Sequence, residues 1–235
     1  VAQHVKKKAK KHGIKQGSFI YGVLERLTRS IVKAKTVLMY GVIANLKPQY
    51  IGVWNGQKMP SSAVVVAAKL ANIPVVYFEN GLLPNSVTCD WRGVNCENSL
   101  PTSPAFYRQF ATQNAVEQQL VQRQSKTKKG QGICESRLPK RYIFVPFQVE
   151  TDSQVVRNSP WITSMADFYR VLEDALPFID DDVCIIIKEH PSENQRYDHL
   201  HHKNERIMFC NQSTTDTLIG KAEALITLNS TVGLE

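Results

Sequence analysis

The chain has 235 residues, of which 43% are apolar, enough for one large or two small domains of ordinary globular composition. No stretch approaches the roughly 20 consecutive apolar residues that cross a bilayer, and no apolar segment of a secretory signal follows the lysine-rich start. Five scattered cysteines without a C-x-x-C pair favour neither a disulfide framework nor a zinc site, which fits a reducing, cytoplasmic location.

The positive charge is concentrated at the N-terminus. Residues 1–35 hold ten Lys or Arg and one acidic residue, a net charge of +9, so the remaining 200 residues carry −1 of the total of +8. We expect 1–35 to form a basic helical arm, which is either a solvated face or a contact for an anionic inner-membrane surface, at about 1 kcal/mol per basic residue. No aromatic residues interleave with the lysines, so nucleic acid is the least favoured partner.

The first half of the chain predicts a strand–helix–strand unit. Its two strands are apolar without alternation, which is typical of a parallel sheet buried on both faces. Ser61 and Ser62 are expected to cap the helix between them. The expected elements are one or two helices over 18–46, a strand over 50–54, a helix over 63–71, a strand over 75–78, a long loop over 79–105 and a helix over 109–124.

A second α/β pattern begins at residue 141, after a basic, glycine-containing stretch that reads as a linker over 125–140. Two doubly wound sheets joined by a linker predict two Rossmann-like domains, the GT-B architecture, with 36–124 on the acceptor side and 141–235 binding a nucleotide sugar. The chain starts without Met and stops inside an expected helix, so we expect a fragment with a truncated C-terminal domain. The expected strands are 142–145, 183–187, 207–209 and 224–228, with helices over 162–176, from Ser213 or Thr214 to about 221, and from 229 onward.

Ligands of such sheets bind outside the carboxyl ends of the strands, and polar residues follow three strands of the second half. The first strand is followed by Gln148, Asp152 and Gln154. Asp152 is a candidate nucleophile or base, or a helix cap without further function.

The other two strand ends carry groups that suit an anion. Lys188 and His190 follow the second strand, and a His beside a Lys suits a phosphate or carboxylate, unless it is a turn histidine. Ser230 and Thr231 follow the last strand, where small hydroxyl residues at a helix start form an anion site or a simple cap. Three such signals on one sheet could reach one bound nucleotide.

In the first half, Glu79 follows the strand over 75–78 and is a candidate general acid/base facing an interdomain cleft, although a Glu-Asn-Gly turn at a strand end is also common. The sequence holds no Walker A, G-x-G-x-x-G or H-E-x-x-H motif, so P-loop, dinucleotide and zincin interpretations lack their signatures.

Taken together, five segments resemble the bacterial capsular polysaccharide biosynthesis proteins that act as β-Kdo glycosyltransferases. The resemblance covers roughly residues 50–235, and its most specific parts are Gln-x-x-x-Asp-Ser-Gln and Asn-Ser-Thr-Val-Gly-Leu-Glu. The segments are Phe78-Glu-Asn-Gly81, Asp90-x-x-Gly-Val-Asn95-x-x-x-Ser99-Leu-Pro101, Val145-Pro-Phe-Gln148-x-x-x-Asp152-Ser-Gln154, Lys188-x-His190-Pro191 and Asn229-Ser-Thr-Val-Gly-Leu-Glu235.

The resemblance implies a retaining transfer of Kdo from CMP-Kdo to a glycolipid or growing capsule saccharide, without metal or other cofactor. Asp152 matches the nucleophile and Glu79 the acid/base, and two carboxylates across a cleft are what a double displacement requires. The resemblance also implies supporting groups: His190, Ser230 and Thr231 at the CMP phosphate, with Lys188 and Gln154 beside the donor, Gln148 orienting the nucleophile or sugar, and Glu235 at the ribose.

Three rival interpretations remain open. Another CMP- or CDP-dependent GT-B transferase, such as a CDP-glycerol glycerophosphotransferase or a sialyltransferase-like enzyme, also places His-Pro and Ser/Thr at phosphates. A non-catalytic capsule export or assembly protein could keep the fold, although it would not need both Glu79 and Asp152. A nucleic-acid binder acting through residues 1–35 would show steeply salt-dependent DNA binding.

Overall fold

A computed structural model describes residues 1–82, 86–113, 138–193 and 197–234. The chain divides into two compact units, Val1–Val121 and Gln122–Glu235. The predicted linker over 125–140 lies outside the described residues except for 138–140, and so does Glu235.

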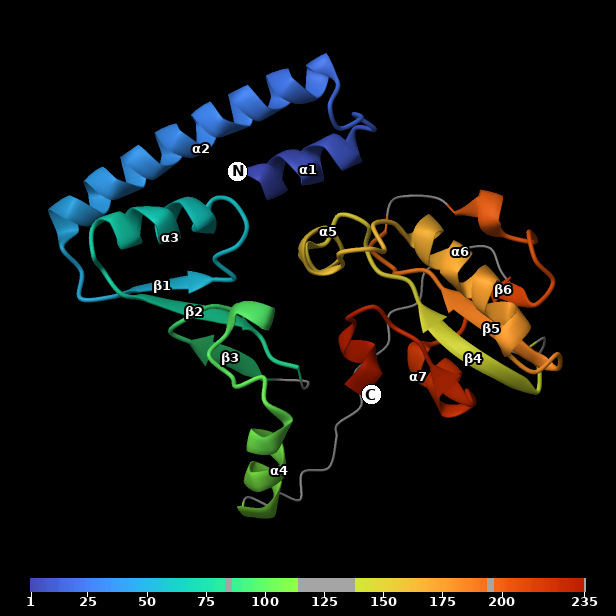
Figure 1. Cartoon of the computed structure of the whole chain (residues 1–235). Coiled ribbons are helices and arrows are strands. Elements are labelled where there is room, and N and C mark those ends of the chain that lie inside the picture. The colour runs from blue at the N-terminus through green and yellow to red at the C-terminus, as the bar shows by residue number, and fades with distance from the viewer. Residues whose placement is uncertain (83–85, 114–137, 194–196, 235) are drawn as a thin grey trace. The chain divides into compact units, whose positions relative to one another are not determined.

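Two helices open the first unit. α1 (Ala2–Lys11) folds back beside the long helix α2 (Phe19–Leu46), as Figure 1 shows. The predicted arm boundary at residue 35 falls inside α2, which is continuous. At its start, the Oγ of the N-cap residue Ser18 accepts a hydrogen bond from Tyr21 N at 3.2 Å. At its end, the C-cap residue Lys47 has the left-handed conformation. None of the described helices has the length and apolar character needed to span a bilayer.

The first unit contains a three-stranded sheet in the order β1-β2-β3, with β1 (Ile51–Trp54), β2 (Val75–Asn80) and β3 (Val87–Asp90). β1 and β2 are parallel and joined through α3 (Ser61–Leu70), as predicted. β3 runs antiparallel to β2, so the prediction of a loop over 79–105 and of a purely parallel sheet is wrong for this part. The short 3-10 turn η1 (Asn95–Glu97) also lies in that range.

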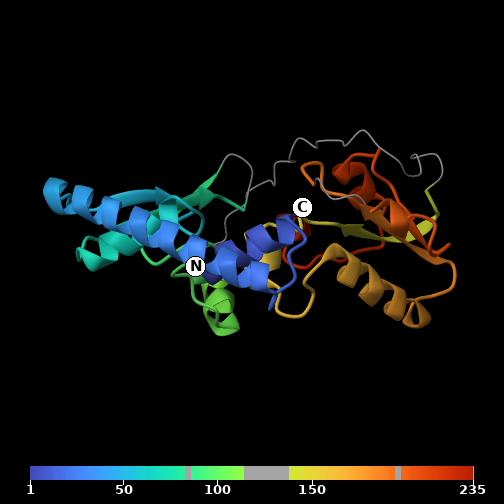
Figure 2. The ribbon, with the colours of Figure 1, turned by 90° about the horizontal axis from the view of Figure 1, so that it is seen from above.

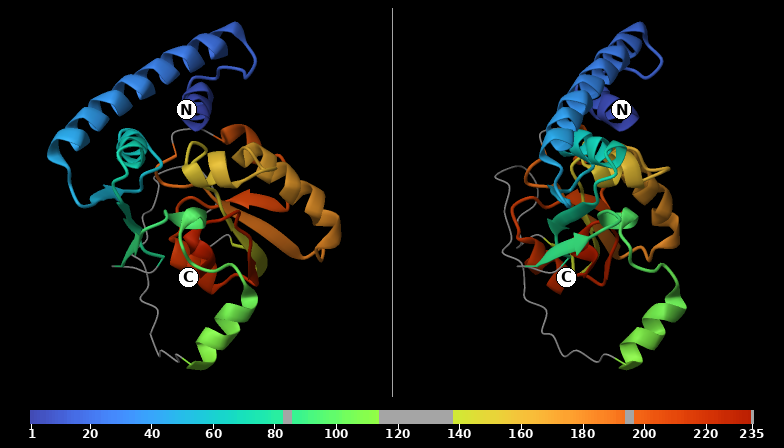
Figure 3. Two further views of the ribbon diagram at one scale, coloured as in Figure 1. Left: turned by 60° about the vertical axis from the view of Figure 1, so that its left-hand side comes forward. Right: turned by 90° about the vertical axis from the view of Figure 1, so that its left-hand side faces the viewer.

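The start of α3 also differs from the prediction. The N-cap residue is Pro60, without a side-chain cap hydrogen bond, and Ser61 and Ser62 lie inside the first turn. Ser62 contacts α1 instead, because its Oγ lies 3.2 Å from His4 Nε2. The last described helix of this unit, α4 (Pro104–Gln113), stands apart from the sheet in both views of Figure 3.

The core of the first unit lies between α3 and the sheet, where Ala67 and Ala68 pack against Val53, Val75 and Tyr77. These side chains are small on the helix and large on the strands, so the two layers approach closely.

The second unit contains a four-stranded, fully parallel sheet in the order β6-β5-β4-β7. The four predicted strands are present, but the last is only two residues long. The strands are β4 (Arg141–Pro146), β5 (Val183–Lys188), β6 (Ile207–Phe209) and β7 (Ala224–Leu225). The helices are α5 (Ser153–Asn158), α6 (Met165–Ala175) and α7 (Thr215–Gly220), with 3-10 turns η3 (Leu176–Phe178), η4 (Asp198–Leu200) and η5 (Thr231–Leu234).

Helices cover both faces of this sheet (Figure 2). On one face Val145, Ile185 and Ile187 pack against Phe168 and Leu172 of α6. On the other, strand residues that include Phe144 and Ile186 pack against Leu218 of α7. Burial on both sides explains why these strands are apolar without alternation.

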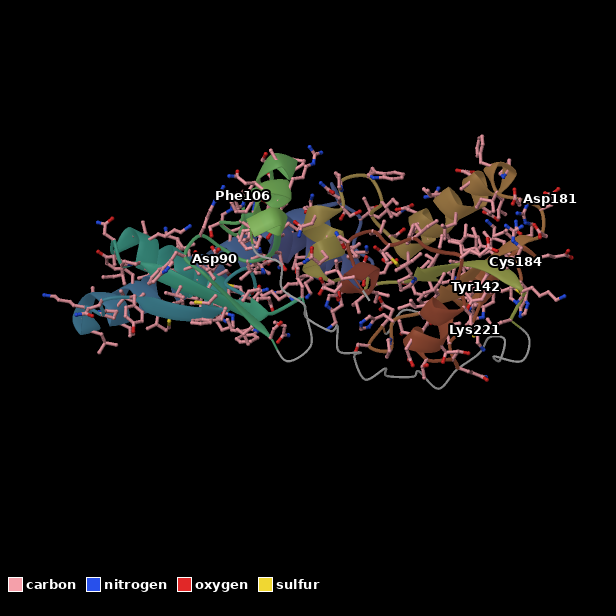
Figure 4. The ribbon with its side chains drawn as sticks, turned by 90° about the horizontal axis from the view of Figure 1, so that it is seen from below. Asp90, Phe106, Tyr142, Asp181, Cys184 and Lys221 are labelled. Carbon is pink, nitrogen blue, oxygen red and sulfur yellow. The ribbon has the colours of Figure 1, made fainter. Side chains whose placement is uncertain are left out.

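The amino ends of β4 and β5 meet at a charged edge, near Asp181 and Cys184 in Figure 4. Arg141 binds Glu223 at 2.6 Å and Asp182 at 2.7 Å, and its hydrogen bond lowers the pKa of Asp182. These ion pairs are exposed, so they contribute little to stability. The polar residues predicted to bind a ligand lie at the opposite, carboxyl edge.

Candidate donor site at the carboxyl edge of the second sheet

The sheet of the second unit reverses its strand order between β4 and β7. β5 and β6 lie on one side of β4, whereas β7 lies on the other. The connections that leave β4 and β7 therefore diverge, and such a switch point opens a crevice at the carboxyl ends where ligands of open α/β sheets bind.

Side chains from the segments that follow β4 and β7 meet at this switch point. Gln148, two residues beyond β4, donates from Nε2 to Asn229 Oδ1 at 3.0 Å. Asn229 donates in turn from Nδ2 to the carbonyl oxygen of Gln154 at 3.0 Å. The structure thus brings Gln148 and Gln154 together with the Asn-Ser-Thr segment, which lies 75 or more residues further along the chain.

Asp152 is the N-cap of α5. Its Oδ1 accepts a hydrogen bond from Gln154 N at 2.9 Å, and the side chain is half-buried. The cap interpretation therefore describes what Asp152 does in the structure. A cap also holds the carboxylate at a defined position next to Gln154, whose carbonyl group binds Asn229.

His190 lies exposed two residues beyond β5. Its Nδ1 lies 3.1 Å from Ser192 N and accepts that hydrogen bond. A neutral imidazole in this arrangement carries its proton on Nε2, which makes Nε2 a hydrogen-bond donor. A donor at a strand end suits a phosphate oxygen.

Lys188 does not project from the strand end, as its predicted role at the donor would require. Only 3% of the residue is exposed, and its Nζ donates to the carbonyl oxygens of Ser213 at 2.5 Å and Asn211 at 3.2 Å. Burial lowers the pKa of Lys188, while the nearby Cys210 and Asp216 act in the opposite direction. The ammonium group thus holds the segment after β6 against β5.

Ser230 and Thr231 follow Asn229 directly and are half-buried. The helix expected from residue 229 onward is the 3-10 turn η5 in the described residues. Ser230 Oγ accepts a hydrogen bond from Val232 N at 3.3 Å, so this hydroxyl caps the turn beside the Gln148–Asn229 pair.

The predicted site omitted Asn229 and three buried glutamates, Glu150, Glu189 and Glu193. Asn229 is the first residue of the Asn-Ser-Thr-Val-Gly-Leu-Glu motif, and its position beside Ser230 could have indicated that it belongs to the site. The glutamates lie within five residues of a strand end, but the sequence cannot show that a carboxylate there is buried.

Glu79, the predicted acid/base, belongs to the first unit and lies on β2 itself, so it does not follow the strand as predicted. Its Oε2 accepts a hydrogen bond from Asn55 Nδ2, and its Oε1 accepts one from Asn80 N at 3.0 Å. Asn55 lies just beyond β1 with a positive φ of 63°. The carboxylate is therefore fixed at the carboxyl edge of β1 and β2.

The Asp90 motif forms a folded loop in the first unit, where Figure 4 labels Asp90. The Asp90 carboxylate accepts hydrogen bonds from Gly93 N at 3.0 Å, Arg92 N at 2.7 Å and Ser99 N at 2.9 Å. Burial raises the pKa of Asp90, but the hydrogen bonds from Ser99, Gly93 and Arg92 outweigh it and hold the pKa well below its ordinary value. A Cβ on Gly93 would lie 2.7 Å from Glu97 O, so the loop requires glycine there.

This loop is joined to the Glu79 segment. Gln57 donates from Nε2 to Glu97 Oε2 at 3.1 Å, and its backbone N–H donates to Asn55 Oδ1 at 3.1 Å.

Among the residues that the structure describes, no group of three or more His, Cys, Asp and Glu side chains gathers as metal ligands would.

The fold and the strand-end groups define an α/β protein with polar side chains gathered at the switch point of a parallel sheet. Residues 114–235 match the family described as capsule polysaccharide biosynthesis protein. This match covers more than half of the chain, which therefore belongs to that family.

The chain is also similar to protein FixF of Sinorhizobium fredii, with 33% identity over 186 residues. The alignment covers 78% of this chain and 44% of FixF, so the chain spans less than half the length of that relative.

Two solved structures align at low similarity. Thermosulfurimonas dismutans KpsC, a β-Kdo 2,7 transferase, has 16% identity and a TM-score of 0.48, over 83% of this chain and 64% of that one. A co-structure of S. aureus MnaA with UDP has 14% identity and a TM-score of 0.38, over 86% of this chain and 57% of that one. At these scores the likenesses add nothing to the description of the fold.

Proposed function

We propose that this chain is part of a glycosyltransferase of capsule biosynthesis that transfers Kdo from CMP-Kdo to a glycolipid or a growing saccharide. The observation that carries the proposal is the Gln148–Asn229–Gln154 network at the switch point of the second sheet. It gathers the polar residues of two strand ends where a nucleotide would bind. Membership of the capsule family supports the biological setting.

In the proposed reaction Asp152 attacks the anomeric carbon of Kdo. The bond from that carbon to the phosphate oxygen breaks, and CMP leaves with the electron pair. His190 Nε2 and the Ser230 and Thr231 segment hold the charge of the departing phosphate, which lowers the barrier without a metal ion.

The second step releases the enzyme. The oxygen of an acceptor hydroxyl attacks the Kdo–Asp152 adduct, a general base takes the hydroxyl proton, and the Asp152 carboxylate departs. Two displacements at one carbon retain its configuration. The hydrogen bond from Gln154 N keeps the Asp152 carboxylate oriented, and Gln148 orients the sugar.

Intact-mass spectrometry with CMP-Kdo tests the nucleophile. The wild-type chain should gain the mass of one Kdo, and Asp152→Asn should not, because Asn caps a helix as well as Asp but lacks the nucleophilic carboxylate. Asp181→Ala, at the opposite edge of the same sheet, is the matched control and should retain the adduct. An adduct that survives in Asp152→Asn refutes the assignment, and labelling by CMP-sialic acid or turnover of CDP-glycerol instead would identify a different donor.

We also propose that the basic arm contacts an anionic membrane surface. Apolar side chains of α2 are exposed next to basic ones, an arrangement that favours an interfacial position. The exposed apolar residues include Phe19, Ile20, Leu27 and Ile31, with Arg26 and Arg29 between them. Deletion of residues 1–12 should reduce binding to phosphatidylglycerol vesicles, and so should Arg26→Gln combined with Arg29→Gln in the full chain, with neutral phosphatidylcholine vesicles as the control. Unchanged binding in both variants would contradict this role.

A further inference from the structure

Three buried glutamates lie in the loops that follow β4 and β5. Glu150, Glu189 and Glu193 are only 4%, 5% and 8% exposed. A buried carboxylate costs several kcal/mol unless hydrogen bonds compensate for the lost water.

Glu193 joins two loops of the site. Its Oε2 accepts a hydrogen bond from Glu150 N at 2.6 Å, in the loop that carries Gln148 and Asp152. Its own backbone N–H donates to His190 O at 3.0 Å. One residue thus connects the His190 turn after β5 to the loop after β4.

Glu150 extends this connection to a helix. Its Oε1 accepts a hydrogen bond from Met165 N at 2.7 Å, at the first residue of α6. Burial, followed by the charges of Glu150 and Glu193, raises the pKa of the neighbouring Tyr197. The loop after β4 is therefore held between Glu193 and α6.

The other side of His190 is fixed independently. Glu189 Oε1 lies 3.1 Å from His201 Nε2, with both side chains 7% exposed, and Glu189 N donates to Asn211 Oδ1 at 2.8 Å. The His201 ring stacks on Phe209 at 4.1 Å between centroids. Glu189 anchors the turn to its own half of the sheet, whereas Glu193 sets its position relative to the loop of Asp152.

We propose that Glu193 is a positioning residue that fixes His190 relative to the Gln148–Asp152 loop, so that the groups for the donor phosphate and the anomeric carbon are held together before the donor binds. This inference rests on the proposed function. The hydrogen bond to a charged oxygen is strong enough for this role, and its loss leaves the buried Glu150 N–H without its acceptor.

Three variants of Glu193 distinguish the role of its side chain as a hydrogen-bond acceptor for Glu150 N from the role of its negative charge. Glu193→Met fills the space without an acceptor, Glu193→Asp keeps the charge but shortens its reach, and Glu193→Gln keeps an acceptor oxygen at full length. Glu173→Met is the matched control, because Glu173 binds Lys203 at 2.6 Å on the outside of α6.

Calorimetric titration with CMP gives the first result. Glu193→Met should weaken CMP binding about tenfold, Glu193→Asp should weaken it severalfold, and Glu193→Gln and Glu173→Met should stay near wild type.

In the double variant of Glu193→Met with His190→Ala, the loss of CMP affinity should be smaller than the product of the two single losses, because both changes remove the same contact. Multiplicative losses, or full affinity in both Glu193→Met and Glu193→Asp, would overturn the inference.

A measurement without ligand keeps this test separate from the proposed function. The proton–carbon NMR signal of the His190 ring, assigned with His190→Ala, should shift in Glu193→Met and Glu193→Asp but not in Glu173→Met. If the wild-type chain does not bind CMP, the donor assignment fails, and the ring signal alone then decides the role of Glu193. An unmoved His190 signal in Glu193→Asp contradicts that role even if Glu193→Met does not fold.

Discussion

Replacing Asn229 with alanine removes the link between the two strand ends at the switch point. The change deletes the hydrogen bonds to Gln148 Nε2 and to Gln154 O, each 3.0 Å long. No backbone group is removed, so the strands themselves should still form.

The cost of this change follows from the burial of the two partners. Each hydrogen bond contributes about 1 kcal/mol net, and more where the abandoned partner is fully buried. Gln148 and Gln154 are half-buried, so water reaches them in part, and the free energy of unfolding should fall by about 2 kcal/mol. For a unit of this size the midpoint of thermal unfolding should then fall by roughly 8 °C.

Calorimetric unfolding of three variants tests this magnitude. Asn229→Asp keeps the acceptor for Gln148 but loses the donor to Gln154, so it should show roughly half the loss. Asn158→Ala is the matched control, because it deletes a hydrogen bond to Gln154 Oε1, 2.8 Å long, that lies within α5 and does not join the two strand ends. Equal midpoints for Asn229→Ala and Asn158→Ala would refute the reasoning. A large loss of stability with unchanged CMP affinity would instead show that the network supports the fold but not a donor site.

Two further predictions concern pH. Because burial lowers the pKa of Lys188 in the folded chain, the unfolded chain binds more protons between that lowered pKa and about 10.5, so the free energy of unfolding should rise with pH across this window. Urea unfolding of Lys188→Met at pH 8 and pH 10 should lack this rise, and an identical slope in wild type and variant would contradict it. The depressed pKa of Asp90 gives stability that is present above its ordinary pKa and lost as the pH falls below it. Asp90→Asn should therefore lose less stability than wild type between pH 5 and pH 2, and parallel acid-unfolding curves would contradict that expectation.

The strands of the second unit were predictable because they are buried on both faces. β4, β5 and β6 are uninterrupted apolar runs between polar turns, so their positions follow from hydropathy. β7 is shorter than predicted, since only Ala224 and Leu225 pair with β4. Thr214 caps α7 through its side chain, as expected from the Ser-Thr pair at that position.

The elements that the sequence did not predict lack such a signal. β3 is exposed along most of its length and reads Val-Thr-Cys-Asp, so it has no apolar face to reveal it. α5 has six residues, too few for a helical period to show. Its cap was nevertheless one of the two interpretations of Asp152.

The candidate site was predictable in outline because strand ends of a parallel sheet converge. That rule placed Gln148 near the Asn229 segment, and the structure brings them into contact. The rule could not show that the Lys188 side chain is buried against carbonyl oxygens, whereas His190, two residues later, is exposed. Nor could it find Glu193, whose importance depends on a contact with a loop 43 residues away.

Hydrogen–deuterium exchange with and without CMP tests the donor site most directly. CMP should slow exchange in peptides covering 147–154, 189–193 and 229–232, while peptides at the amino edge around Arg141, Asp182 and Glu223 should not change. Protection at the amino edge, or unchanged exchange throughout the second unit at saturating CMP, would contradict a donor site at this switch point.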